Sequence, residues 1–331
     1  MKIGLAGLGF MGSTHVRAYS TLPNVTLAAV CSRHPSRLAG ELSDAGGNIG
    51  EAGRFDFSGL KKYDSLEGMF ADPDLEAVDL CLPTHAHEAA VVAALAAGKH
   101  VMVEKPMSFD HASCQRMIAA AKQAGRILMT AQVLRFFPTY TCLETAIPNL
   151  GTIRTAAFRR RCAMPRWGAW FTDRSKSGGG IFDLLIHDVD MCLHLFGTPV
   201  AVSASGFEDL ANAVDLIDAR FHYAQGRTIT IRGGWHPGAF PFSMDYTIVG
   251  DAGTIEFSSI GKPPTLYGTS ETSELPIDGP DGYASEIAYF AECCRTNTPP
   301  VRCAPEDSAE AVRLAILMRD SRELNGERIS V

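Results

Sequence analysis

The chain opens with Lys2-Ile-Gly-Leu-Ala-Gly-Leu-Gly-Phe-Met-Gly12, in which the spacing Gly-x-Gly-x-x-Gly directly follows a short apolar run. The apolar run predicts a β-strand, and residues 12–20 predict a helix. Gly7 permits a tight turn, Gly9 permits a close approach of the backbone to a pyrophosphate, and Gly12 lets the helix pack against the strand. This stretch therefore predicts the start of a parallel sheet that binds a dinucleotide.

Strand and helix patterns continue to alternate as far as residue 131. The predicted strands are 26–30, 77–82, 100–103 and 127–130, and the predicted helices between them are 88–97 and 110–124. Strands that alternate with helices predict a doubly wound parallel sheet. Residues 45–60 are rich in glycine and poor in large apolar residues, which predicts a surface insertion.

The pattern changes after Gln132, where strand-like segments follow one another directly. The predicted strands are 152–161, 200–207, 215–223, 228–234, 243–250 and 254–257, and the predicted helices are 180–196, 284–295 and 306–323. Consecutive strands joined by tight turns build an antiparallel sheet. We therefore predict an α/β Rossmann domain over residues 1–131 and a second α+β domain over 132–331, built on a mostly antiparallel sheet.

Composition limits the class of protein. The formal net charge of −7 argues against a nucleic-acid partner or an anionic membrane surface, which both require clustered lysine and arginine. No apolar run approaches the roughly 20 residues of a membrane-spanning helix. The nine cysteines include no Cys-x-x-Cys pair, so we expect reduced thiols and a cytoplasmic location.

The end of the second predicted strand carries the cofactor preference. A carboxylate that binds the ribose 2′-hydroxyl is expected about 20 residues beyond the glycine motif, but the sequence there is Cys31-Ser32-Arg33, with Arg37 one turn later. Neutral and cationic side chains tolerate a 2′-phosphate, so NADP is favoured over NAD. The alternative is that Arg33 and Arg37 only solvate the start of a helix.

The stretch Val101-Met-Val-Glu-Lys-Pro106 places Lys105 at the carboxyl end of a predicted strand. Ligands of open α/β sheets bind outside the carboxyl ends of the strands, so this cation is directed toward a ligand. Pro83-Thr-His-Ala-His87 follows the preceding strand at the same edge. These residues either contact a ligand or begin a helix.

Gly178-Gly179-Gly180 precede a helix that is apolar around most of its circumference. Asp183, His187, Asp190 and His194 nevertheless fall on one stripe of this helix. Asp183 can orient the His187 imidazole, and the pair has the composition of a general base. Asp190 and His194 fit a structural network equally well, and no set of ligands with zinc spacing accompanies them, so we predict no metal.

These motifs together resemble the Gfo/Idh/MocA oxidoreductases over nearly the whole chain. The resemblance implies an open-faced antiparallel sheet that is buried in a homodimer or homotetramer, and hydride transfer between NAD(P) and a secondary hydroxyl of a sugar, cyclitol or related polyol. It implies that Lys105 polarises the hydroxyl, that His187 accepts the proton, and that Asp183 is the partner of His187.

The resemblance also implies the binding residues. Those expected at the cofactor are Gly7, Gly9, Phe10, Met11, Gly12, Ser32, Arg33, Arg37, Pro83, Thr84, His87, Glu104, Lys105 and Arg135. Those expected at the substrate are Lys105, Arg161, Trp170, Asp183, His187 and Tyr283. Trp167 and Trp170 are compatible with sugar stacking and equally with core packing.

Two other activities remain open. Some relatives hydrolyse glycosides through transient oxidation by a tightly held NAD. Others have lost catalysis and bind sugars as regulators, which the presence of Lys105, Asp183 and His187 argues against.

Overall fold

The computed structural model describes residues 1–43, 45, 53–166 and 168–331. The chain divides into two compact units, 1–133 with 280–309 and 134–279 with 310–331, and each is described by itself. Helix α9 (Gly282–Thr296) belongs to the first unit, where it packs against α1 (Phe10–Tyr19). Sequence analysis placed this helix in the second domain, because a return of the chain to an earlier unit leaves no local signal. The domain boundary between residues 131 and 132 remains a prediction.

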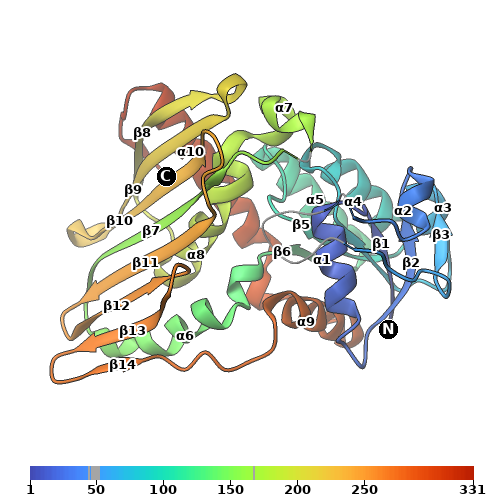
Figure 1. The fold of residues 1–331 in the computed structure, drawn as a ribbon, viewed down its shortest axis with the longest axis horizontal. Helices are drawn as coiled ribbons and strands as arrows, with labels where there is room; N and C mark the ends of the chain where they lie inside the picture. Colours follow the sequence, from blue (N-terminus) through green and yellow to red (C-terminus); the bar gives the residue numbers. More distant parts are fainter. Residues whose placement is uncertain (44, 46–52, 167) are drawn as a thin grey trace. The chain divides into compact units, whose positions relative to one another are not determined.

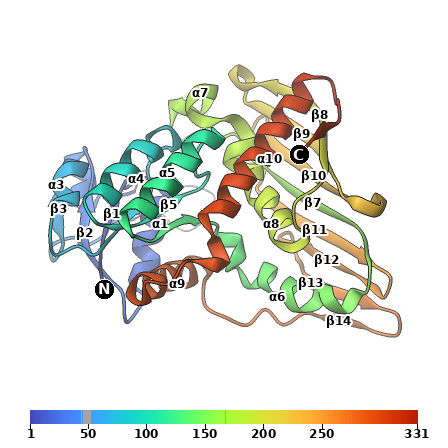
Figure 2. The same ribbon diagram turned by 180° about the vertical axis from the view of Figure 1, so that it is seen from behind.

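The first unit contains a six-stranded parallel sheet in the order β3-β2-β1-β4-β5-β6. The strands are β1 (Lys2–Ala6), β2 (Thr26–Cys31), β3 (Lys61–Tyr63), β4 (Ala77–Leu80), β5 (His100–Glu104) and β6 (Leu128–Ala131). Helices α4 (His87–Ala96) and α5 (His111–Ala124) lie on one face and α1 on the other (Figures 1 and 2). Short helices α2 (Pro35–Leu38) and α3 (Leu66–Phe70) complete the crossovers. This confirms the predicted Rossmann architecture.

The segment 45–60 differs from the predicted surface insertion. Residues 46–52 lie outside the described part of the chain, but Ala45 and Phe57 are buried, and the rings of Phe55 and Phe57 stack with their centroids 6.2 Å apart. These apolar side chains therefore contribute to the core. Strand β3 follows directly and was missed because Lys61-Lys62-Tyr63 is short and polar.

The second unit contains a nine-stranded mixed sheet in the order β14-β13-β12-β11-β7-β10-β9-β8-β15. The strands are β7 (Ile153–Ala163), β8 (Ala201–Asp209), β9 (Val214–His222), β10 (Thr228–His236), β11 (Ser243–Gly250), β12 (Gly253–Ser258), β13 (Lys262–Gly268), β14 (Thr272–Glu274) and β15 (Ile329–Ser330). The pairing is antiparallel except between β7 and β10, which run parallel. The mostly antiparallel sheet is confirmed, and the last three strands were not predicted.

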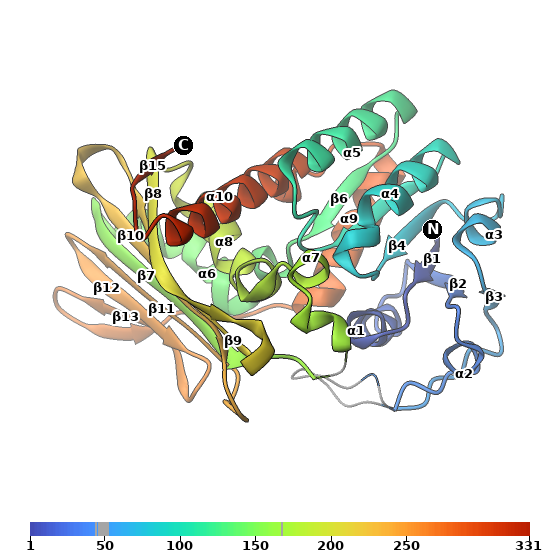
Figure 3. The same ribbon diagram turned by 90° about the horizontal axis from the view of Figure 1, so that it is seen from above.

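One face of this sheet is covered by helices and the other is open. Helices α6 (Pro138–Ala146), α8 (Ile186–Phe196) and the end of α10 (Pro305–Glu323) lie over one face, as Figures 2 and 3 show. On β7, Phe158 and Arg160 are buried on the helix side, whereas Ala157 and Arg159 are exposed on the other side. None of the helices in the described residues combines the length and apolar character needed to cross a bilayer.

A buried ion pair fixes α8 on the central strand. Arg160 Nε donates to Asp188 Oδ2 over 2.8 Å, and these side chains are 4% and 0% exposed. Arg160 Nη2 also donates to Asp188 Oδ1 and to the hydroxyl of Tyr140 on α6. One strand and two helices therefore share a single buried guanidinium.

We expect Asp188→Asn to lower the free energy of unfolding by about 3 kcal/mol, because it leaves the Arg160 cation buried without its carboxylate. Arg154→Ala is the matched control. The Arg154–Asp251 pair is 2.6 Å apart but its side chains are 63% and 45% exposed, so its loss should cost less than about 1 kcal/mol. Urea unfolding followed by circular dichroism measures both. Equal losses in the two variants would contradict this account.

Candidate active site

The glycine loop after β1 has the geometry of a phosphate cradle. Gly7 has a φ of 94°, and a Cβ there would lie 2.2 Å from the Cys81 carbonyl oxygen. A Cβ on Gly12 would lie 1.9 Å from the Gly7 carbonyl oxygen. Gly9 is different, because it is exposed and no atom lies within 4 Å of its Cβ position. The loop therefore leaves open space beside Gly9 at the start of α1, where backbone N–H groups can bind a pyrophosphate. Phe10 and Met11, half-buried, form the first turn.

Lys105 follows β5 directly and its side chain is half-buried. Its backbone N–H donates to Glu104 Oε2 over 3.0 Å. The neighbouring parallel strand β4 is followed by Pro83, which is exposed, and by Thr84, which begins a 3₁₀ turn. Lys105, Pro83 and Thr84 therefore follow adjacent strands at one edge, as the sequence predicts.

His87 is at the same edge but is fully buried. Its Nε2 lies 2.8 Å from the Leu82 carbonyl oxygen and its Nδ1 lies 3.0 Å from that of Pro106. Burial lowers the pKa of His87, so the ring is neutral at neutral pH. His87 therefore joins the loops after β4 and β5, a supporting position in place of the predicted cofactor contact.

The residues expected at a 2′-phosphate follow β2. Ser32 is half-buried, Arg33 is exposed, and Arg37 is half-buried in α2. Burial raises the pKa of the Cys31 thiol to about 11, with Asp64 contributing, so the thiol is uncharged at neutral pH. Asp64 follows the adjacent strand β3. Its carboxylate favours a ribose 2′-hydroxyl, whereas Arg33 and Arg37 favour a 2′-phosphate.

The glycine run before α8 allows a close approach to β9. The Gly180 N–H donates to Asp215 Oδ2 over 2.6 Å, and a Cβ on Gly179 (φ 76°) would lie 2.3 Å from the same oxygen. Arg322 of α10 binds the other Asp215 oxygen. The helix then begins with a π-helical turn, Ile181–Leu185, which contains Asp183. π-Turns are frequent at functional sites.

The predicted polar stripe of this helix divides into two parts. Asp183 and His187 are half-buried. Asp190 is 1% exposed and pairs with Arg135, whose Nη2 and Nε donate over 2.7 and 2.8 Å. His194 pairs with Glu144 at 3.0 Å. Because the Arg135 guanidinium is buried against α8, we replace its predicted cofactor contact by a structural ion pair.

Comparison with known proteins follows from this geometry. Residues 1–132 match the oxidoreductase family with an NAD-binding Rossmann fold, and residues 148–256 match the GFO/IDH/MocA C-terminal domain. The chain belongs to the Gfo/Idh/MocA oxidoreductases. It is therefore an NAD(P)-binding oxidoreductase.

Individual relatives support the same family. The chain is 30% identical to myo-inositol 2-dehydrogenase of Thermotoga maritima over 98% of this chain and 96% of that protein. It is 34% identical to 1,5-anhydro-D-fructose reductase of Ensifer adhaerens over 70% and 72% of the two chains. The structure of a levoglucosan dehydrogenase in complex with NADH has the same fold, with a TM-score of 0.85, 19% identity and coverage of 100% and 99%.

Arg161 and Trp170, which are also expected at the substrate, both lie in the second unit, and their contact with the substrate stays a prediction. Arg161 is on the sheet face opposite α8, where its guanidinium donates to Ser243 Oγ and lies 5.5 Å from the Phe240 ring. Trp170 stacks on Phe171 with ring centroids 3.8 Å apart and packs against the core around Trp235. Core packing therefore explains Trp170, and Trp167 lies outside the described residues.

Tyr283 lies in the first unit, and its contact with the substrate stays a prediction. It is 6% exposed on α9 in the first unit, and its ring centroid lies 6.0 Å from that of His15. It therefore belongs to a buried cluster around His15. The cluster's other members are Asp79, Cys81, Glu104 and Glu286, which contact His15 or interact with it electrostatically, and Tyr19, whose hydroxyl donates to Asp79.

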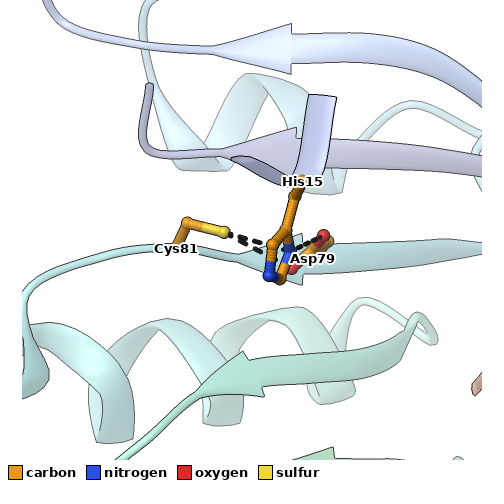
Figure 4. A group of neighbouring side chains, drawn as sticks. All are labelled: His15, Asp79 and Cys81. Carbon is orange, nitrogen blue, oxygen red and sulfur yellow. Dashed lines mark hydrogen bonds and ion pairs between the residues drawn. The ribbon is translucent and has the colours of Figure 1, made fainter. Parts of the chain in front are cut away.

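His15, Asp79 and Cys81 are close enough together to suggest metal ligands (Figure 4). The His15 Nδ1 lies 2.8 Å from Asp79 Oδ2, which is a direct hydrogen-bond distance. Two tetrahedral ligands on zinc lie about 3.3 Å apart, given metal–ligand distances of about 2.0 Å. Burial raises the pKa of the Cys81 thiol, which keeps it protonated. Direct hydrogen bonds therefore explain the cluster, and the prediction of no metal stands untested.

A cavity of about 960 Å³ opens at the opposite, amino-terminal edge of the Rossmann sheet. Its lining includes Glu76, Lys99 and His100, which precede or begin β4 and β5. The chemistry of this fold belongs to the carboxyl edge, so we do not assign the cavity to the active site.

Sequence analysis missed Asp79, Asp215 and Glu286, which are all nearly or fully buried. Asp79 had a detectable signal, because a carboxylate within a fully buried parallel strand requires a cationic partner. Asp215 begins a predicted strand and resembles an ordinary edge residue in the sequence.

Proposed function

We propose that this protein transfers hydride between NADP and a secondary hydroxyl of a sugar, cyclitol or related polyol. The observation that carries the proposal is the division of the α8 stripe. Asp190 is buried in an ion pair with Arg135 and His194 pairs with Glu144, whereas Asp183 and His187 keep half-buried side chains near the start of the helix. Two ionisable groups held at the start of a rigid helix are suited to catalysis.

A nicotinamide dinucleotide, held at its pyrophosphate by the loop from Gly7 to Gly12, would supply the acceptor for the hydride of the substrate carbon. Lys105 donates a hydrogen bond to the reacting oxygen and stabilises the alkoxide as it forms. His187 accepts the hydroxyl proton, and Asp183 orients the imidazole. Reduction of a carbonyl uses the same groups in reverse. Relatives named for inositol, anhydrofructose and levoglucosan support a polyhydroxylated substrate.

We expect Lys105→Met and His187→Asn each to lower kcat by about 100-fold or more with little change in cofactor affinity, because each removes an interaction with the reacting hydroxyl. Asp183→Asn should cost less, since it orients the base. A screen of sugars, inositols and dihydrodiols by NAD(P)H absorbance supplies the substrate. His194→Asn on the same helix and Lys122→Met on α5 are matched controls and should stay within about twofold. Full activity in the Lys105→Met, His187→Asn double variant would remove the assignment.

Two alternative functions give different results in the same screen. A redox-neutral hydrolase cleaves a glycoside without releasing reduced cofactor. A sugar-sensing regulator binds ligand without turnover. In that case neither the wild-type protein nor Lys105→Met shows a measurable rate.

The cofactor preference rests on Ser32, Arg33 and Arg37 after β2. We expect Arg33→Ala to weaken NADPH binding by about tenfold and to leave NADH binding unchanged, because only NADPH carries the 2′-phosphate. Gly9→Ala should weaken both cofactors alike, since its methyl group enters the phosphate space. Calorimetric titration with each cofactor measures these effects. Tighter binding of NADH than of NADPH by the wild-type protein would show that Asp64 outweighs the arginines.

The open sheet face supports assembly into a homodimer or homotetramer. Ala157, on the central strand β7, is exposed between Thr230 and Thr247 of the neighbouring strands. Phe207 on β8 is 61% exposed. An antiparallel sheet can leave one face in water, but apolar side chains exposed on such a face mark an interaction surface.

We expect light scattering to report a dimer or tetramer, and Ala157→Arg to shift it to a monomer because the arginine has no room in a packed interface. Ala89→Arg, an exposed site on α4, is the control and should not change the assembly. A monomeric wild-type protein at micromolar concentration would exclude the assembly.

The cysteines support a cytoplasmic location as part of the proposal. None of the nine forms a disulfide within the described part of the chain, and all except Cys81 are buried. A reducing compartment preserves such thiols.

A further inference from the structure

Three ionisable side chains form a buried row beneath the carboxyl end of β5. His15 comes from α1, Asp79 from β4 and Glu104 from β5, and they are 0%, 0% and 5% exposed. The His15 Nδ1 donates to Asp79 Oδ2 over 2.8 Å, and its Nε2 lies 3.2 Å from Glu104 Oε1. The second contact is an ion pair rather than a well-aligned hydrogen bond. Figure 4 shows the His15 ring directed at Asp79 on β4.

The row reaches Lys105 through Glu104. The second oxygen of Glu104 accepts the backbone N–H of Lys105 over 3.0 Å. The Lys105 ammonium also favours the ionised form of Glu104. The Glu104 carboxylate thus contacts His15 through Oε1 and the Lys105 backbone through Oε2.

The charges of His15 and Glu104 depend on neighbouring groups that shift their pKa values in the direction opposite to burial. Burial is the largest single influence on the pKa of His15 and lowers it, but Asp79 and Cys81 together raise it by more. The pKa therefore lies well above the ordinary value, and the ring is positive at neutral pH. Burial raises the pKa of Glu104, but His15 and Lys105 together lower it by a larger amount, so its pKa lies below the ordinary value.

Glu286 shows what happens to a carboxyl in this cluster without a cationic partner of its own. It is 0% exposed on α9, and neither of its oxygens has a hydrogen-bond partner among the described residues. Burial raises the pKa of Glu286 well above its ordinary value, and Glu104 and Asp79 add to the rise. Glu286 is therefore neutral while Glu104 is charged.

The charged and titratable groups that surround His15 come from four elements and the adjoining loops. They are Tyr19 on α1, Asp79 and Cys81 on and after β4, Glu104 and Lys105 on and after β5, and Asp281, Tyr283 and Glu286 at α9. His15 is the cation that contacts both Asp79 and Glu104 within this group.

We propose that His15 is a positioning residue for Lys105, and that it acts by keeping Glu104 ionised and oriented toward the Lys105 backbone. The proposal rests on the proposed role of Lys105 at the reacting hydroxyl. Without the His15 charge, the buried Glu104 keeps only Lys105 as a cationic neighbour, and we expect it to take up a proton. A protonated Glu104 gives Lys105 no anionic neighbour and only a neutral acceptor for its backbone N–H.

The first test counts neutral glutamates by NMR of protein labelled with ¹³C at the glutamate side-chain carboxyl, at pH 7.5. We expect His15→Gln to gain one neutral carboxyl signal relative to the wild-type protein, and the His15→Gln, Glu104→Gln double variant to lose it again. Tyr19→Phe is the matched control, because it removes a 3.1 Å hydrogen bond to Asp79 on the side away from Glu104. It should gain no signal.

The second test is the pH profile of kcat between pH 6 and 9 with saturating cofactor and substrate. A carboxyl with a raised pKa ionises only at higher pH. We therefore expect His15→Gln to lose about tenfold in kcat at pH 6 to 7 and to recover toward the wild-type value by pH 9, with KM nearly constant. Tyr19→Phe should follow the wild-type profile.

Two results would overturn the proposal. One is an unchanged count of neutral glutamates in His15→Gln. The other is a loss of kcat that is equal at every pH, since a merely structural role lowers activity uniformly. Full activity in Lys105→Met would instead refute the proposed function, and the carboxyl count would still show whether His15 sets the charge of Glu104.

Discussion

The cost of burying charge is the constraint on which both units depend. An isolated ionised group in a protein interior loses several kilocalories per mole of hydration, so it persists only where a partner and hydrogen bonds replace the water. In the second unit, Arg160 and Arg135 meet that condition for Asp188 and Asp190 and thereby hold α8 on the sheet. In the first unit, His15 does the same for Asp79 and Glu104. Each part of the proposed catalytic machinery adjoins one of these buried pairs.

The close approach of backbones is a second, related requirement. Gly7 and Gly12 allow β1, α1 and the end of β4 to meet at distances that a Cβ would prevent. Gly179 and Gly180 do the same for Asp215 and the start of the helix that contains Asp183 and His187. Both glycine groups therefore fix the place of a helix start.

These features explain how much the sequence could predict. The glycine motif, the alternating strands and the position of Lys105 depend on local geometry, because a turn after a strand requires particular backbone angles. The orientation of Arg135, Arg161 and Tyr283 depends on which face of a strand or helix packs inward, and that is decided by residues far away in the chain. Strands β13 to β15 are short or polar, and the parallel pairing of β7 with β10 has no signature in either segment.

The same distinction separates the three buried acidic side chains of the cluster around His15 in the first unit. The sequence around Asp79, Glu104 and Glu286 does not indicate which of them is charged. His15 provides one cation within the cluster, and it contacts Asp79 and Glu104 but makes no hydrogen bond to Glu286 among the described residues. A single imidazolium can offset two carboxylates only because Lys105 lies on the far side of Glu104. No cation is left to offset the third buried carboxyl, Glu286, which is therefore neutral. The negative charge next to Lys105 is then that of Glu104 alone.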